Sequence, residues 1–223
     1  MKHILYPICI FILTCITTKG TAQLNTTIPE NNYFEGRIIY DLSYVPKTNN
    51  ISKEQASILF GDKQVFTIKD DMYKNEMNGA LKMTQHYLGN DTLFISTTQS
   101  KELLWVDVTK INDEIIDTEI TENVEVINGI TCNLLTITSN KGYYKYYYNT
   151  SYKINYQYYI NHKVGYWDIS ALETKSLMIK GIKDTKEEHV ELIAVDIQNT
   201  VIDETEFKLP NYTRKRFPIK YDK

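Results

Sequence analysis

The chain has 223 residues, of which 42% are apolar and 24% are charged, and its formal net charge at pH 7 is −3. This length and composition are typical of a folded chain of one or two domains, and they argue against a disordered or collagen-like chain. The acidic balance argues against nucleic acid as a partner, because nucleic-acid binding requires a basic face.

The first 22 residues have the pattern of a secretory signal peptide. An apolar run over residues 4–16 is shorter than a membrane-spanning helix requires, and the small residues Gly20-Thr21-Ala22 form a cleavage site after it. Removing residues 1–22 takes away two lysines and no acidic residue, so the net charge falls from −3 to −5. We therefore expect an exported protein, periplasmic or associated with the outer membrane, with no transmembrane span after the signal is removed.

A bacterial lipobox is a second interpretation of the same segment. Ile12-Leu13-Thr14-Cys15 would make Cys15 a lipidated first residue, and the lipid would tether the protein to a membrane. Cleavage after residue 22 would instead leave Cys132 as the one cysteine of the mature chain, which cannot form an internal disulfide. Both processing routes stay open.

The mature chain is predicted to start with a flexible leader over residues 23–32, which are polar. Residues 34–44 then alternate between apolar and polar side chains, which is the period of a half-buried strand. Tyr40 and Leu42 belong to the apolar face of this strand. A flexible leader followed by a strand places the start of the folded domain near residue 33.

A short helix is predicted over residues 53–60. Ser52 is followed three residues later by Gln55, which is the pattern of a capping box. Gly61 can adopt the left-handed conformation that ends many helices.

Short strands separated by turn signals make up most of the remaining chain. Asp70-Asp71 indicates one hairpin turn, and Asn128-Gly129 is the strongest hairpin dipeptide. No linker rich in Gly or Pro divides the chain, so we expect one domain over residues 33–212, followed by a solvated basic tail over residues 213–223. The pattern predicts a mainly β (α+β) fold with an antiparallel sheet of about ten strands. Further strands are predicted over residues 64–69, 72–77, 81–87, 92–97, 103–108, 115–126, 130–138, 177–182 and 190–197.

Tyrosine is concentrated in one stretch, where nine of the seventeen residues from Tyr143 to Tyr159 are tyrosine. Alternation predicts two strands here, with a turn at residues 149–151. Cross-strand aromatic pairs stabilise sheets, so one interpretation is structural. The other is a ligand wall, because a tyrosine is apolar along its ring and polar at its tip. On the proposed wall face lie Tyr144, Tyr146 and Tyr148 of the first strand, and Ile154, Tyr156, Tyr158 and Ile160 of the second.

Motifs for catalysis, metal binding or a cofactor are absent from the sequence, so we expect a protein that is not an enzyme. The chain has no G-x-S-x-G, H-E-x-x-H, Walker or G-x-G-x-x-G pattern. His86, His162 and His189 lie far apart without the spacing of metal ligands. Cys132 falls on the apolar face of its strand, where a cysteine acts as a small apolar side chain rather than a nucleophile.

Four segments resemble the GLPGLI and DUF4412-like group of exported Bacteroidetes proteins. They are residues 34–40 (FEGRIIY), 126–132 (VINGITC), 191–197 (ELIAVDI) and 203–210 (DETEFKLP), and the resemblance covers most of residues 33–212. That group is similar in layout to LolA-like lipoprotein carriers. The resemblance implies a single curved antiparallel sheet that forms an unclosed barrel, with one or two short helices in or over its concave face. It also implies an apolar concavity for acyl chains, with the helix near residues 53–60 as part of a lid.

We therefore expect a non-catalytic protein of the cell envelope that binds a hydrophobic or lipid-like ligand in the half-barrel. An outer-membrane or surface module that binds another envelope protein is the alternative, and an enzyme with a dispersed site is a third. Neither of the first two functions requires a cofactor. The ligand-binding residues are predicted to be Tyr40, Leu42, Tyr144, Tyr146, Tyr148, Ile154, Tyr156, Tyr158 and Ile160.

Overall fold

A computed structural model describes residues 33–48, 51–111 and 113–217. The predicted signal peptide, lipobox and leader lie outside the described residues, as does the end of the chain from residue 218. Among the described residues, no helix has the length and apolar character needed to cross a membrane.

One twelve-stranded sheet dominates the fold, in the order β12-β6-β5-β4-β3-β2-β1-β11-β10-β9-β8-β7. Neighbouring strands pair antiparallel except β12 and β6, which are parallel. The strands are β1 (Gly36–Pro46), β2 (Lys63–Lys69), β3 (Met72–Met77), β4 (Thr84–Leu88), β5 (Thr92–Ser96), β6 (Glu102–Asp107), β7 (Ile115–Ile127), β8 (Ile130–Ser139), β9 (Gly142–Lys153), β10 (Ser176–Thr185), β11 (Glu188–Asn199) and β12 (Thr213–Arg216).

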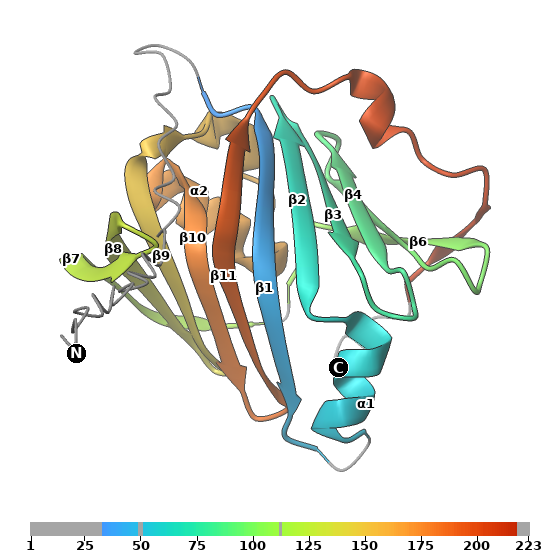
Figure 1. The fold of residues 1–223 in the computed structure, drawn as a ribbon, viewed down its shortest axis with the longest axis horizontal. Coiled ribbons are helices and arrows are strands. Elements are labelled where there is room, and N and C mark those ends of the chain that lie inside the picture. The colour runs from blue at the N-terminus through green and yellow to red at the C-terminus, as the bar shows by residue number, and fades with distance from the viewer. Residues whose placement is uncertain (1–32, 49–50, 112, 218–223) are drawn as a thin grey trace, which may run out of the picture.

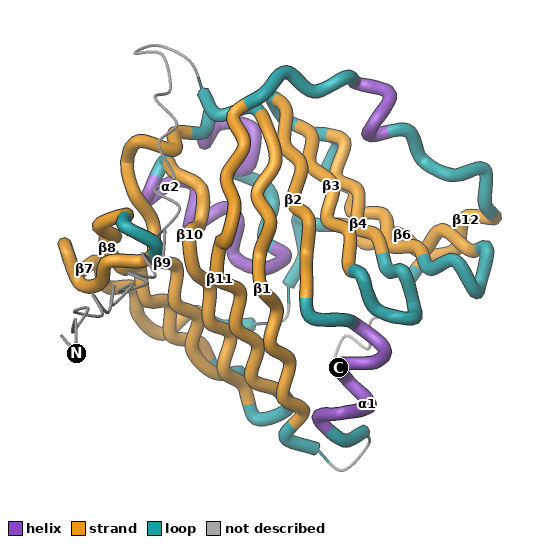
Figure 2. The backbone as a smooth tube through the Cα atoms, in the orientation of Figure 1, coloured by secondary structure: helices purple, strands orange, loops and turns teal. Residues whose placement is uncertain are grey.

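The sheet curves strongly but does not close, and its two free edges are β7 and β12 (Figures 1 and 2). The segment between β9 and β10 lies on the concave side and contains η1 (Tyr156–Tyr159), η2 (Val164–Tyr166) and α2 (Trp167–Thr174). The predicted fold class, an unclosed half-barrel with short helices in its concave face, is confirmed. The sheet also continues beyond residue 212, because β12 lies within the segment predicted to be a solvated tail.

Helix α1 (Lys53–Phe60) has the predicted capping box, with Ser52 and Gln55 each accepting from the other's backbone N–H. The helix lies beside one end of β1, where the rings of Phe60 and Tyr44 are 5.0 Å apart. None of the described α1 residues lines the concave cavity. The expectation that this helix forms part of a lid is therefore wrong; the segment between β9 and β10 covers the concave face instead.

The hairpin predicted at Asn128-Gly129 is confirmed. Both residues have positive φ angles, 48° and 83°, as a type I′ turn requires. The Asn128 side-chain amide also donates to the carbonyl of Ala194 at 2.6 Å, so the tip of the β7–β8 hairpin contacts β11.

The second tyrosine strand, predicted over residues 154–160, is wrong. Strand β9 continues through the predicted turn to Lys153, and the chain then leaves the sheet to form η1. The Asn155 side chain accepts from the backbone N–H of Gln157, a local bond that competes with strand pairing. In η1 the predicted wall residue Tyr158 is 41% exposed, and its neighbour Tyr159 is the one that is fully buried.

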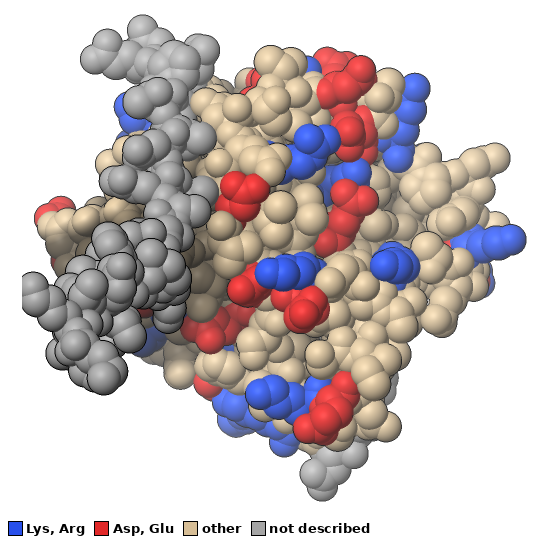
Figure 3. Space-filling model, viewed as in Figure 1, with Lys and Arg blue, Asp and Glu red and all other residues tan. Residues whose placement is uncertain are grey.

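The outward face of the sheet carries alternating charges, which Figure 3 shows across its centre. Glu206 of η3 (Glu204–Phe207) pairs with Arg37 at 2.9 Å and with Lys74 at 3.5 Å. Lys180 pairs with Glu125 at 3.2 Å and with Glu191 at 3.6 Å. Apolar side chains such as Phe66, Leu93 and Leu192 lie on the opposite, concave face.

Candidate functional site

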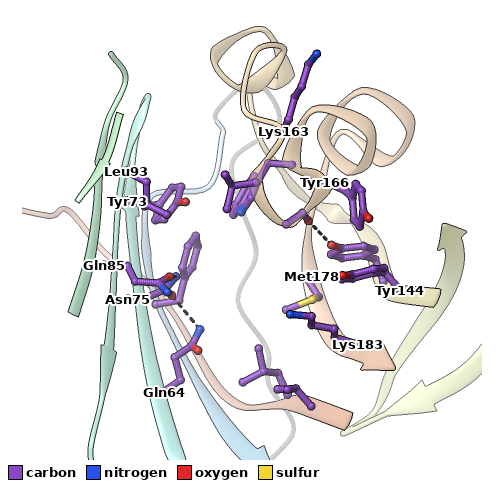
Figure 4. Close-up of a pocket in the computed structure, with 18 of the residues that line it drawn as sticks. Gln64, Tyr73, Asn75, Gln85, Leu93, Tyr144, Lys163, Tyr166, Met178 and Lys183 are labelled. Atoms are coloured by element: carbon purple, nitrogen blue, oxygen red, sulfur yellow. Dashed lines mark hydrogen bonds between the residues drawn. The ribbon is translucent and has the colours of Figure 1, made fainter. Parts of the chain in front are cut away.

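A cavity of about 720 Å³ lies inside the curve of the sheet. Strands β2–β4 form one wall and β9–β10 the facing wall, with the segment around Lys163–Tyr166 above them (Figure 4). Its volume falls within the range of small-molecule sites, which is about 300–1,000 Å³. Apolar side chains from both walls line it, including Phe66, Leu93, Ile95, Met178, Ile182 and Leu192.

Three of the predicted ligand-binding residues line this cavity: Tyr40, Tyr144 and Tyr146. The Tyr40 hydroxyl donates to the carbonyl of Met178 at 2.6 Å, and the Tyr146 hydroxyl donates to the carbonyl of Gly165. Burial raises the pKa of both phenols, so both remain protonated donors at neutral pH.

The other six predicted residues are not among those that line the cavity. Leu42, Tyr148 and Ile154 are buried in the core, and Tyr156 packs partly buried against it. Tyr158 is 41% exposed and Ile160 54% exposed. Of the three β9 residues predicted for the wall, Tyr144 and Tyr146 line the cavity and Tyr148 does not, and the prediction fails for all of the residues after β9.

An aromatic cluster attaches the covering segment to the sheet. Trp167 stacks on Tyr73 with ring centroids 5.2 Å apart and an interplanar angle of 11°, and the Tyr159 ring lies 4.8 Å from Trp167. The Tyr159 hydroxyl donates to the carbonyl of Asp70 at 3.0 Å. This cluster forms one end of the cavity, because Tyr73 and Trp167 are also lining residues. Its members are Phe66, Tyr73, Tyr87, Tyr159, His162 and Trp167.

His162 belongs to this cluster and is fully buried. Its Nε2 lies 2.8 Å from the Tyr73 hydroxyl, and its Nδ1 has no hydrogen-bond partner. Burial lowers the pKa of His162 to about 4, so the imidazole is neutral at physiological pH. Burial likewise raises the pKa of the Cys132 thiol to about 11, which keeps it protonated. Both side chains are fully buried in the core.

Sequence reasoning missed a row of carboxamides on the cavity wall. Gln64, Asn75 and Gln85 come from the adjacent strands β2, β3 and β4, and all three line the cavity (Figure 4). Gln64 Nε2 donates to Asn75 Oδ1 at 2.9 Å, and Asn75 Nδ2 donates to Gln85 Oε1 at 3.3 Å. A signal was present, because Gln64 shares its parity with the apolar Phe66 and Ile68, and an amide in such a set is unusual.

The segment between η1 and α2 was also missed, although Lys163 to Trp167 all line the cavity. Gly165 and Tyr166 both have positive φ angles, 68° and 56°, which turn the chain sharply into α2. Gly165 is the detectable signal, because such a turn favours glycine. Tyr166 then donates to a carboxylate oxygen of Asp113 at 2.7 Å.

Two of the charged groups at the cavity, Lys183 and Asp113, have partners of their own, and Lys110, Lys141, Lys145 and Lys163 also line it. Lys183 extends toward the cavity (Figure 4) and forms an ion pair with Glu188. Burial acts to lower the pKa of Lys183, but the Glu188 carboxylate outweighs it and the pKa is raised. Asp113 accepts the bond from Tyr166, so the wall has no unpaired acid–base dyad at these positions.

Within the described ranges, no three His, Cys, Asp or Glu side chains come together as metal ligands would. Comparison with family models finds no match to this chain, and comparison with curated proteins finds none either. The resemblance to the GLPGLI and DUF4412-like group therefore stays a prediction that rests on the four sequence segments.

Proposed function

We propose that this protein binds a hydrophobic or lipid-like ligand in the half-barrel cavity, without catalysis, as an exported component of the cell envelope. The observation that supports the proposal is the cavity of about 720 Å³, which is lined largely by apolar side chains inside an unclosed sheet. A cavity of this kind has a function without any reactive group, since binding requires only apolar burial and a few polar contacts.

The energetics favour a long-chain ligand. Burying about fifteen CH₂ groups contributes about 12 kcal/mol, and association costs at least about 4 kcal/mol. The difference corresponds to a dissociation constant in the micromolar range. The affinity falls gradually as CH₂ groups are removed, so we propose an acyl chain or an apolar molecule of similar size.

Native mass spectrometry of the protein purified from its own host tests the proposal. We expect a second species whose added mass matches a lipid and which disappears after extraction with organic solvent. A single apo mass, together with no binding of added long-chain amphiphiles, would contradict ligand binding.

An interaction module is the second candidate, because the edge strand β7 exposes apolar side chains. Ile116 and Val126 are each 65% exposed, Ile120 is 42% exposed and Val124 is 39% exposed. An exposed edge strand can pair with a strand from another chain. If this candidate is correct, the protein should be recovered as an apo species in complex with a partner, and Ile120→Lys should abolish that complex.

A further inference from the structure

The row of carboxamides in the cavity wall follows the register of the sheet. Tyr40 of β1 lies directly opposite Gln64 of β2, and Asn75 of β3 lies directly opposite Gln85 of β4. Gln64 reaches Asn75 diagonally, because the direct partner of Asn75 on β2 is Phe66. The result is a continuous polar row across four adjacent strands of an otherwise apolar face.

This row has unused hydrogen-bonding capacity. Each carboxamide offers two N–H donors and an oxygen with two lone pairs. The two bonds within the row use one N–H each of Gln64 and Asn75, and one lone pair each of Asn75 and Gln85. Both N–H groups of Gln85 and the oxygen of Gln64 are outside these bonds, so more than half of the capacity is left for a group in the cavity.

The position of the row makes this capacity significant. Gln64 is only 7% exposed, and the neighbours of the same parity on β2 and β3 are Phe66, Ile68, Tyr73 and Met77. A buried amide that lacks partners destabilises a fold by about 1–3 kcal/mol, which an apolar residue would avoid. One buried and two partly buried amides lie side by side, and their remaining hydrogen-bonding capacity indicates that the wall is suited to a polar partner inside the cavity.

We propose that the cavity selects an uncharged amphiphile whose polar group both donates and accepts hydrogen bonds, an amide or a hydroxyl. The polar group lies against Gln64, Asn75 and Gln85, and the chain lies along the apolar wall formed by residues such as Met178 and Leu192. This inference rests on the proposed function and specifies the ligand class of the same site.

The neutrality of the carboxamide row is the reason that we propose an uncharged polar group on the ligand. A carboxamide row is neutral and cannot compensate a buried ion, whose transfer out of water is far more costly than that of a neutral polar group. The lysines that line the cavity, among them Lys141, Lys163 and Lys183, come from β9, β10 and loops, and none comes from the strands β2–β4 that carry the row. An ester or ether would leave the row's acceptors unused, because it has no donor.

Four probes of equal chain length test the inference: dodecanamide, 1-dodecanol, dodecyl methyl ether and dodecanoate. Binding is followed by the fluorescence of Trp167, which lines the cavity, in a Trp105→Phe background that removes the second tryptophan. We expect the amide, the alcohol or both to bind at least tenfold more tightly than the ether and the dodecanoate. The amide and alcohol arms then identify which of the two groups the row prefers.

The variant Gln85→Leu is expected to remove this tenfold preference. Gln198→Leu is the matched control, because Gln198 is exposed on β11 and should leave every affinity unaltered. Thermal unfolding of both variants establishes that they fold. The comparison of the four probes uses the protein with the carboxamide row intact, so it does not depend on either variant.

Equal affinity for the four probes, or tightest binding of dodecanoate, would overturn the inference and leave the proposed function standing. A preference that survives Gln85→Leu in the folded variant would overturn the role of the row. Failure of all four probes to bind would overturn both the inference and the proposed function.

Discussion

Tyrosine hydroxyls in this protein donate to groups that are distant in sequence. Tyr40 bonds the carbonyl of Met178 and Tyr159 bonds that of Asp70, while Tyr146 bonds Gly165 of the covering segment. A carbonyl partner in a buried position satisfies the polar tip of the ring. Of the two interpretations of the tyrosine-rich stretch, the structural one accounts for Tyr159, and two residues of the stretch, Tyr144 and Tyr146, line the cavity.

The adjacent residues Tyr158 and Tyr159 allow the contribution of a buried tyrosine hydroxyl to stability to be tested. We expect Tyr159→Phe to lower the free energy of unfolding by about 1 kcal/mol, because it removes the hydrogen bond that the fully buried Tyr159 donates to the carbonyl of Asp70. Tyr158→Phe is the control, since Tyr158 is 41% exposed, and its effect should stay within about 0.5 kcal/mol. Urea denaturation measures both, and equal losses would show that the hydroxyl of Tyr159 contributes nothing specific.

His162 predicts a pH dependence of stability. Its pKa is about 4 in the folded state and 6.5 in the unfolded state, so the unfolded chain binds more protons between these values. Stability therefore rises with pH through this window, and it falls by about 3 kcal/mol as the pH drops from 6.5 to 4.

Denaturation at a series of pH values measures the effect. His162→Gln should flatten the profile between pH 6.5 and 5, above the range in which most carboxylates titrate. His189→Gln is the comparison, because His189 lies at the surface beside Asp184. A profile unchanged by His162→Gln would mean that this imidazole titrates normally in the folded protein.

At the scale of elements, the end of α1 depends on one glycine. Gly61 has a φ of 89° and a ψ of −170°, so it does not adopt the left-handed helical conformation expected for it, and a Cβ there would lie 1.9 Å from Asn78 Oδ1. The Asn78 amide oxygen in turn accepts from the backbone of Asp62 and Lys63 as β2 begins, both at 3.0 Å. The capping box therefore starts the helix, and the glycine with its amide neighbour ends it.

Substitution of two glycines with positive φ angles, Gly129 and Gly61, compares a site without steric overlap with a site where a Cβ would overlap a neighbour. Gly129 has a similar φ of 83°, but a Cβ there would meet nothing within 4 Å. We expect Gly129→Ala to lower the free energy of unfolding by about 1 kcal/mol through strain alone. Gly61→Ala should cost at least about 2 kcal/mol, because the overlap adds to the strain. Equal effects in chemical denaturation would show that Asn78 moves aside freely.

The elements that could be predicted are those whose signals, such as alternation, turn residues and helix caps, lie within a few residues of each other. Helix α1 was predicted with its bounds, because Ser52 and Gln55 are local signals that act within one turn. Strands β2 to β6 were predicted to within a few residues, because alternation and turn residues are also local. The segment after Lys153 was not predictable from alternation, since Asn155 redirects the backbone and the tyrosines that follow pack on Trp167 and the distant Tyr87.

At the scale of the whole molecule, the curvature of one sheet creates the cavity. Strands β2–β4 and β9–β10 are separated by β1 and β11 in the sheet order, and they contribute to the same lining because the sheet bends between them. The aromatic cluster holds the covering segment in place and keeps part of the concave face from being filled. A flat sheet with the same strands would have no such enclosed volume.

Filling the cavity tests whether this volume is the binding site. Leu192 on β11 lines it, and we expect Leu192→Trp to reduce the affinity for long-chain ligands at least tenfold, because the ring occupies the space of the chain. Val195→Trp is the control on the same strand, where Val195 is 37% exposed and does not line the cavity. Binding followed by native mass spectrometry measures both, and an unaffected Leu192→Trp protein would place the ligand elsewhere.

The sequence by itself determined the local features: a mainly β chain, the capped helix near residue 53, the Asn128-Gly129 hairpin and the buried face of β9. These depend on contacts between residues a few positions apart, so their signals are present in the order of the amino acids. Only the tertiary structure decided which side chains share the cavity. Gln64, Asn75 and Gln85 become one row, and Trp167 meets Tyr73, through pairing register and sheet curvature, which no local pattern encodes.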